Sequence, residues 1–166
     1  QDGEPARPIY KNNSHNTDHE LKGTADRVIY TRGRNKMKRV LIVDDESIVR
    51  VTLRSLTDWE SWGYTLVKDC LDGLQALEYI KNHPVELLIT DMKMPGLDGL
   101  GLIRRLKEEN LLPVTIVLSG YNEFELVREA FRLGVYDYLL KSDLSARMVG
   151  GILEKLNRQY FRESEP

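Results

Sequence analysis

The sequence predicts an α/β fold in which helices cover both faces of a doubly wound, five-stranded parallel sheet. From residue 38 onward, five apolar runs of strand length alternate with segments of helical periodicity. These runs contain few polar residues, which is typical of strands buried on both faces. The alternation favours right-handed crossovers and a three-layer sandwich. The predicted strands are 38–43, 64–69, 86–90, 114–118 and 136–140.

The first three helices are predicted from apolar residues that recur at helical spacing. Asp98 is the predicted N-cap of the third helix, since Asp accepts hydrogen bonds from free N–H groups at a helix start. The three stripes are Ile48, Val51, Leu53 and Leu56, then Leu74, Ala76, Leu77 and Ile80, and finally Leu100, Leu102, Ile103 and Leu106.

The last two helices are predicted from their end signals. Asn122 with Glu125 resembles a capping box for a helix over 123–132, and Gly134 is placed to end it. Asp143 is the predicted cap of the last helix. Its expected inward residues are Leu144, Met148, Ile152, Leu153 and Leu156.

Composition restricts the class of protein. Of 166 residues, 41% are hydrophobic and 30% are charged, which indicates a globular chain. No apolar run approaches the roughly 20 residues that cross a bilayer, and the first residues lack a signal-peptide pattern. The single cysteine, Cys70, excludes an intrachain disulfide and is expected to be a buried thiol. These features predict a cytoplasmic location and no membrane partner.

Charge and complexity divide the chain. Residues 1–36 carry a net charge of +2 and few large apolar residues, so they are predicted to be a tail that is disordered or foreign to the natural protein. The folded domain is expected over 37–160, followed by a C-terminal tail or linker start at 161–166. Residues 37–166 carry a net charge of −4, which argues against direct nucleic-acid binding.

Chemically matched side chains follow four of the predicted strands. Asp44 and Asp45 follow the first strand, Asp91 the third, Ser119 the fourth and Lys141 the fifth. In an open parallel sheet the functional crevice lies outside the carboxyl ends of the strands, so these residues are expected to converge. Helix capping would explain one Asp at a time but not the whole set.

This set of residues suits phosphoryl transfer. Clustered carboxylates repel one another unless they share protons or bind a cation, and Mg²⁺ prefers such oxygen ligands. An aspartate can act as the phosphoryl-accepting nucleophile, and Asp91 is the candidate. Lys141 and the hydroxyl of Ser119 would contact the transferred group.

Four segments together resemble the receiver domain of two-component response regulators, over about residues 38–160. They are LIVDDE (41–46), ITDMKMPGLDG (89–99), LSGY (118–121) and DYLLKS (137–142). More narrowly, two longer stretches look like receivers of YesN/AraC-type transcription regulators, in which a helix-turn-helix domain follows the receiver. The resemblance implies a flavodoxin-like sheet with strand order 2-1-3-4-5. It also favours the interpretation that the chain is an excised receiver.

The resemblance implies a role for each site residue. Asp91 would be the phosphoacceptor, and a sensor histidine kinase would supply the phosphoryl group. Mg²⁺ would be the cofactor. Ser119 would also be the switch hydroxyl, and Tyr138 the switch aromatic. The implied metal ligands are Asp45 directly, Asp44 through water, Asp91, and the backbone carbonyl of Lys93.

The resemblance also implies a signalling output. The domain would be no enzyme beyond its own phosphorylation and dephosphorylation at Asp91. The 123–159 face would switch and control a DNA-binding output domain that this chain lacks, with phosphorylation-dependent homodimers as a further expectation. One departure is Ser142, where the family has proline after the lysine, so a trans bond is expected there and the position of the Lys141 loop stays open.

Three alternatives compete with this interpretation. A flavodoxin-like cofactor module would need a phosphate cradle after the first strand, where acids stand instead. A haloacid-dehalogenase-type phosphatase would carry an Asp-x-Asp pair on the first strand, whereas here the pair is adjacent and the candidate nucleophile follows the third. A degenerate receiver would bind partners without phosphorylation.

Overall fold

The computed structural model describes residues 36–161, so the predicted tail lies almost entirely outside the described residues. These residues form the predicted five-stranded sheet, in which every pairing is parallel and the order is β2-β1-β3-β4-β5. The fold class and the implied strand order are both confirmed. The strands are β1 (Lys38–Val43), β2 (Tyr64–Cys70), β3 (Leu87–Asp91), β4 (Val114–Ser119) and β5 (Asp137–Leu140).

Burial follows the position of each strand in the sheet. All five residues of the central β3 are buried, as are the last four of β1 and the last five of β4. The edge strands β2 and β5 are more exposed and carry the charged residues Lys68, Asp69 and Asp137. Central parallel strands lose water from both faces, which explains their unbroken apolar runs.

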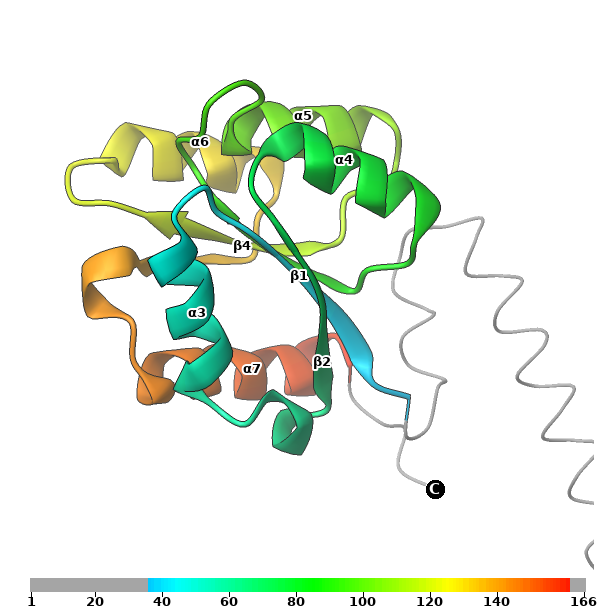
Figure 1. The fold of residues 1–166 in the computed structure, drawn as a ribbon, viewed down its shortest axis with the longest axis vertical. Coiled ribbons are helices and arrows are strands. Elements are labelled where there is room, and N and C mark those ends of the chain that lie inside the picture. Colours follow the sequence, from blue (N-terminus) through cyan, green and yellow to red (C-terminus); the bar gives the residue numbers. More distant parts are fainter. Residues whose placement is uncertain (1–35, 162–166) are drawn as a thin grey trace, which may run out of the picture.

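Helices cover both faces of the sheet, α3 and α7 on one face and α4, α5 and α6 on the other (Figure 1). Two short 3₁₀ helices, η1 (Trp59–Trp62) and η2 (Lys141–Asp143), follow α3 and β5. The α-helices are α3 (Ser47–Leu56), α4 (Gly73–Asn82), α5 (Gly99–Glu108), α6 (Phe124–Leu133) and α7 (Ala146–Gln159).

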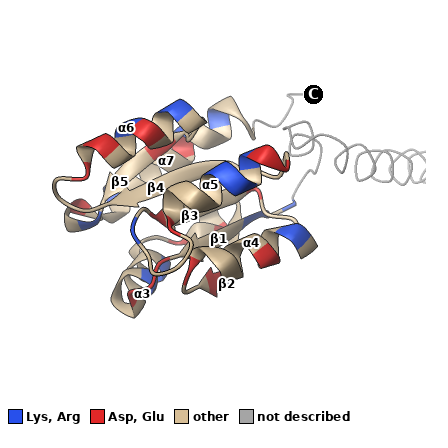
Figure 2. Cartoon of the chain, turned by 90° about the horizontal axis from the view of Figure 1, so that it is seen from above, with Lys and Arg blue, Asp and Glu red and all other residues tan. Residues whose placement is uncertain are grey.

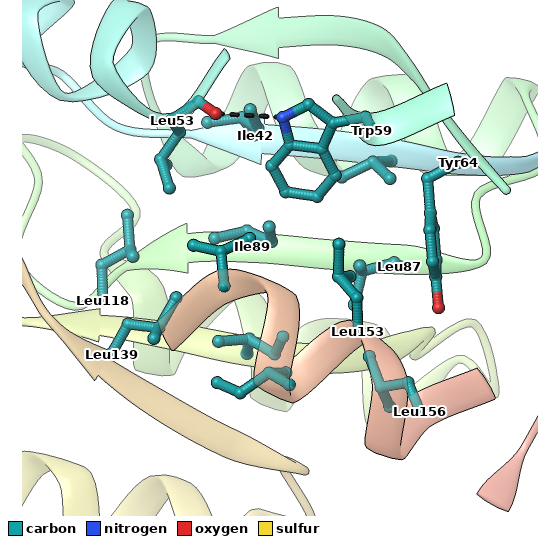
Figure 3. Packing of buried hydrophobic residues seen from close by; sticks show 14 of the residues in the cluster. Ile42, Leu53, Trp59, Tyr64, Leu87, Ile89, Leu118, Leu139, Leu153 and Leu156 are labelled. Atoms are coloured by element: carbon teal, nitrogen blue, oxygen red, sulfur yellow. Dashed lines mark hydrogen bonds between the residues drawn. The ribbon is translucent and has the colours of Figure 1, made fainter. Parts of the chain in front are cut away.

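The core under α3 and α7 contains the largest cluster of buried apolar residues. Leu53 of α3 and Leu153 of α7 pack with Ile89 of the central strand (Figure 3). Trp59 joins this cluster, and its indole N–H donates to the carbonyl oxygen of Leu53 at 3.0 Å (Figure 3). Cys70 is buried in the core on the opposite face, as predicted.

Two of the predicted helix ends are confirmed. The Asp98 carboxylate accepts from the N–H of Gly101 at 2.8 Å at the start of α5. Gly134 ends α6 in the left-handed region, at φ 101°. No described helix is long and apolar enough to cross a bilayer.

Two other predicted helix ends are wrong. Asn122 does not cap α6: it lies in the left-handed region at φ 67°, and the N-cap is Glu123, so α6 begins at Phe124, one residue later than predicted. Asp143 lies in η2, and the hydroxyl of Ser145 instead accepts from the N–H of Met148 at 3.1 Å. The helix thus starts later than predicted, and Met148 in its first turn is 43% exposed rather than inward.

Candidate functional site

An acidic cluster lies at the carboxyl ends of β1 and β3. One carboxylate oxygen from each of four residues, Asp44, Asp45, Glu46 and Asp91, lies within 4.8 Å of all the others. Asp44 and Asp91 are buried, whereas Asp45 and Glu46 are exposed. The cluster therefore has a buried floor and a side open to solvent, through which a ligand can enter.

Lys141 places its ammonium group inside this cluster. Its Nζ lies 2.9 Å from Oδ2 of Asp91, 3.0 Å from Oδ2 of Asp44 and 3.1 Å from Oε1 of Glu46. The Lys141–Ser142 peptide bond is trans, as expected where serine replaces proline. The question left open by Ser142 is therefore answered: the lysine reaches the acidic site from the start of η2.

Burial and the lysine act in opposite directions on the two buried acids. Burial raises the pKa of both Asp44 and Asp91, because it penalises the charged form. The nearby ammonium of Lys141 opposes this rise by favouring the carboxylates. Burial by itself would lower the pKa of Lys141, but its contacts with Asp91, Asp44 and Glu46 outweigh this and raise it. Lys141 thus carries a positive charge at neutral pH.

The orientation of each buried acid is fixed by a backbone N–H group. Asp91 Oδ1 accepts from the N–H of Met92 at 2.8 Å, which leaves Oδ2 toward Lys141. Asp44 Oδ1 accepts from the N–H of Glu46 at 2.8 Å. Asp44 Oδ2 is buried and forms an ion pair with Nζ of Lys141 at 3.0 Å, with no other partner among the described residues.

Two glycines fix the loop that follows Asp91. A Cβ atom on Gly99 would overlap the carbonyl oxygen of Asp91 and lie 2.9 Å from Cα of Met92. A Cβ atom on Gly73 would likewise overlap the carbonyl oxygen of Leu97, to which the Gly73 N–H donates at 3.1 Å. The starts of α5 and α4 therefore approach the loop backbone more closely than any side chain would permit.

The other predicted site residues surround the cluster without joining it. Ser119 is buried at the end of β4, and its hydroxyl has no hydrogen-bond partner. Tyr138 is 39% exposed on β5, with its ring edge-to-face against Phe131 at 6.1 Å between centroids. The side chain of Lys93 points into solvent, with Nζ 3.8 Å from a carboxylate oxygen of Glu123.

Two residues of this region were missed as site residues by the sequence reasoning. Glu46 contacts Lys141 and belongs to the acidic cluster, and its position directly after the acid pair was an available signal. Glu123 accepts from the N–H of Gly120 at 2.8 Å, which turns its side chain back toward the end of β4. No local pattern identifies Glu123, because its role depends on the left-handed turn at Asn122.

The cluster fits a hard divalent cation. Mg²⁺ takes oxygen ligands in octahedral geometry and is commonly held by one or two carboxylates together with water and phosphate. Four carboxylates meet here, and the buried Oδ2 of Asp44, which is held only by the ion pair with Lys141, still has acceptor capacity for a cation or its water. This arrangement of acids is typical of receiver magnesium sites.

The model of the "Response regulator receiver domain" family matches residues 40–150, which include all four acids and Lys141. The chain belongs to the receiver-domain family of response regulators. This membership excludes the flavodoxin-like cofactor module and the dehalogenase-type phosphatase. It also places the chain among signalling domains, which are not conventional enzymes.

Two curated relatives illustrate the similarity. The chain is 37% identical over 126 residues to the transcriptional regulatory protein YesN of Bacillus subtilis, covering 74% of this chain and 34% of YesN. It is 36% identical over 105 residues to the transcriptional regulatory protein HptR of Staphylococcus aureus, covering 63% of this chain and 41% of HptR. The chain thus spans about a third to two-fifths of these relatives.

A solved structure supports both fold and family. The REC domain of AraT, a response regulator from Geobacillus stearothermophilus, superimposes with a TM-score of 0.69 and is 36% identical. The alignment covers 74% of this chain and 95% of the AraT domain. The described residues therefore have the receiver-domain fold.

Proposed function

We propose that this domain receives a phosphoryl group on the carboxylate of Asp91 from the phosphohistidine of a cognate sensor histidine kinase in the cytoplasm. The observation that carries the proposal is the position of Lys141, whose Nζ lies between Asp91 Oδ2 at 2.9 Å and Asp44 Oδ2 at 3.0 Å, in a cluster open to solvent. A carboxylate held beside a fixed cation is suited to accept a phosphoryl group.

In the transfer, an oxygen of Asp91 forms a bond to phosphorus while the bond from phosphorus to the histidine nitrogen breaks. The leaving nitrogen keeps the electron pair of that bond. The N–H of Met92 holds the carboxylate in place during the attack. As one Asp91 oxygen becomes the bridging oxygen of an acyl phosphate, the Lys141 ammonium would pair with the negative charge on the phosphoryl oxygens. Ser119 supplies a hydroxyl to the same group.

The proposed cofactor is Mg²⁺, held by Asp44, Asp45, Asp91 and the backbone carbonyl of Lys93. When bound, this cation neutralises the acids and the incoming phosphoryl oxygens. The exposed position of Asp45 and the closeness of the four carboxylates, which lie within 4.8 Å of one another, support its assignment to these residues. Attack of water on the phosphorus of phosphorylated Asp91 would break its bond to the Asp91 oxygen, release inorganic phosphate and restore the carboxylate.

The proposed output is a shift of the 123–159 face between two arrangements. Engagement of Ser119 by the phosphoryl group would free space for the ring of Tyr138 to turn inward, which biases two pre-existing states. The ring of Tyr138 is 39% exposed, which leaves it room to move, and turning inward would end its edge-to-face contact with Phe131. The same face is the proposed surface for a phosphorylation-dependent homodimer.

DNA would be reached only through an output domain. Both signs of charge occur along α6 (Figure 2), so this helix offers no uniformly basic surface to a nucleic acid. YesN and HptR are transcriptional regulatory proteins, and this chain matches less than half of each. We place the receiver at residues 37–160 and a C-terminal tail or linker start at 161–166, with Phe161 at the boundary packed into the core under α3 and α7.

Intact-mass spectrometry tests the proposal. The protein is incubated with a small-molecule phosphodonor, with and without Mg²⁺, beside the variant Asp91→Asn. One added phosphoryl group that requires both Mg²⁺ and Asp91 is the expected result. No adduct on a protein that is folded by circular dichroism would favour the degenerate receiver, an interaction module that works without phosphorylation.

A further inference from the structure

The loop between β4 and α6, residues 120–123, is closed by a side chain that comes from its own far end. The Glu123 carboxylate accepts from the N–H of Gly120 at 2.8 Å, and its side chain is only 13% exposed. A hydrogen bond from an N–H group to a carboxylate is charge-assisted and stronger than one between neutral groups. This contact therefore fixes the residue that directly follows Ser119.

The backbone of this loop brings Glu123 back to Gly120. Asn122 adopts φ 67°, a left-handed conformation that reverses the chain direction just before α6. Tyr121, at the tip, is 86% exposed, so burial of its ring does not hold the loop in place. The position of the loop therefore depends on the hydrogen bond between Glu123 and Gly120.

The same carboxylate also connects the two loops that border the acidic cluster. Its second oxygen lies 3.8 Å from Nζ of Lys93, two residues after Asp91. The Lys93 side chain is 69% exposed, so this ion pair is weak beside the hydrogen bond to Gly120. Glu123 thus contacts the loop after Ser119 strongly and the loop after Asp91 weakly.

We propose that Glu123 is a positioning residue that holds the β4–α6 loop, and with it Ser119, away from a phosphoryl group on Asp91. The hydroxyl of Ser119 has no hydrogen-bond partner, so it does not engage the Asp91 carboxylate in this arrangement. Movement of the Ser119 backbone toward Asp91 must carry Gly120 along and stretch its bond to Glu123. Glu123 thereby opposes the phosphoryl-bound state of the receiver.

This inference rests on the proposed phosphoryl-accepting function and makes a separate prediction. Beryllium trifluoride, which mimics a phosphoryl group on an aspartate, is titrated in saturating Mg²⁺ against the wild type, Glu123→Ala and Glu123→Gln. Loss of one charge-assisted hydrogen bond is expected to tighten binding of the mimic to Glu123→Ala by about tenfold. Glu123→Gln keeps an acceptor oxygen for Gly120 but loses the charge, so its affinity for the mimic is expected between those of the wild type and Glu123→Ala.

The matched control is Glu125→Gln, two residues further along the same helix. The Glu125 side chain is 79% exposed and lies 3.9 Å from the guanidinium of Arg128. The affinity of the Glu125→Gln variant for the mimic is therefore expected to equal that of the wild type. Affinity for Mg²⁺ alone should be unchanged in all three variants. A purely structural role of Glu123 would change stability without selectively tightening the mimic.

Two results would overturn the proposal. One is a Glu123→Ala variant that is folded and binds the mimic no more tightly than the wild type. The other comes from amide hydrogen exchange of Gly120 in the wild type. The hydrogen bond from the Gly120 N–H to Glu123 should break when the mimic binds, so unchanged protection of this amide contradicts the proposal. Failure of the wild type to bind the mimic would instead refute the phosphoryl-accepting function.

Discussion

Replacement of Gly99 by alanine tests whether the close approach of α5 to Asp91 positions the site. A Cβ at residue 99 would overlap the Asp91 carbonyl oxygen and lie 2.9 Å from Cα of Met92, where ordinary contacts are 3.4–4 Å. Backbone atoms cannot rotate away as a flexible side chain can. The helix and the Asp91–Met92 peptide must therefore separate by at least about 1 Å, and overpacking of this kind costs about 1–3 kcal/mol.

Urea unfolding measures this cost. With a slope of about 2 kcal/mol per molar urea, the midpoint of Gly99→Ala should fall by about 0.5–1.5 M without a change in slope. The matched control is Gly151→Ala in α7, where no atom lies within 4 Å of the added Cβ. Because alanine favours helix over glycine, this control should gain about 0.5–1 kcal/mol of stability.

The same variant should also phosphorylate more slowly, since the shift displaces the carboxylate that Met92 and Lys141 hold. The rate is read from intact mass over time with a small-molecule donor and Mg²⁺. If Gly99→Ala has the urea midpoint and the phosphorylation rate of the wild type, the close approach of α5 does not position Asp91, because the added Cβ is then accommodated without cost.

Three further predictions concern other contacts. Lys141→Met should bind Mg²⁺ more tightly by calorimetry, since one positive charge leaves the cluster, yet accept phosphate more slowly; weaker Mg²⁺ binding would contradict this. Glu86→Gln should lower the free energy of unfolding by about 1–3 kcal/mol, because buried Glu86 accepts three hydrogen bonds from Arg39. Its control is Glu109→Gln, which affects only an exposed pair with Lys81 and should change that free energy by less than about 0.5 kcal/mol. Cys70 should resist thiol reagents in the folded protein, since burial raises its pKa to about 11. Because the thiol of the unfolded chain ionises near 9.0, the unfolded state loses its proton first, and the free energy of unfolding should fall as pH rises from about 9 to about 11.

The parts of this domain that follow from residue pattern were predictable from the sequence. The strands lie within one residue of their predicted ends, since central parallel strands need unbroken apolar runs. Convergence of Asp44, Asp91 and Lys141 followed from the rule that parallel strands end at one edge of the sheet. Direct contact between the lysine and both acids required coordinates, because the Ser142 substitution left the path of the loop open.

Local turns defeated the sequence reasoning. Asn122 satisfied the residue preferences of a helix cap, but the same short side chain also tolerates the left-handed conformation that it adopts here. Asp143 and Ser145 are both acceptable caps, and the intervening 3₁₀ turn decided in favour of Ser145. The proposed role of Glu123 depends on the left-handed turn at Asn122 and on a contact with Gly120, so no pattern of residue types could reveal it.

The role of Asp91 as the phosphoacceptor is tested by identifying the residue that carries the phosphoryl group. After reaction with the donor and Mg²⁺, borohydride reduces an aspartyl phosphate to homoserine, with release of phosphate, and peptide mass spectrometry then identifies the altered residue. The account predicts homoserine at position 91 and no other modified acid in the cluster. Homoserine at position 44 or 45, or a phosphorylated protein with unaltered Asp91, would contradict it.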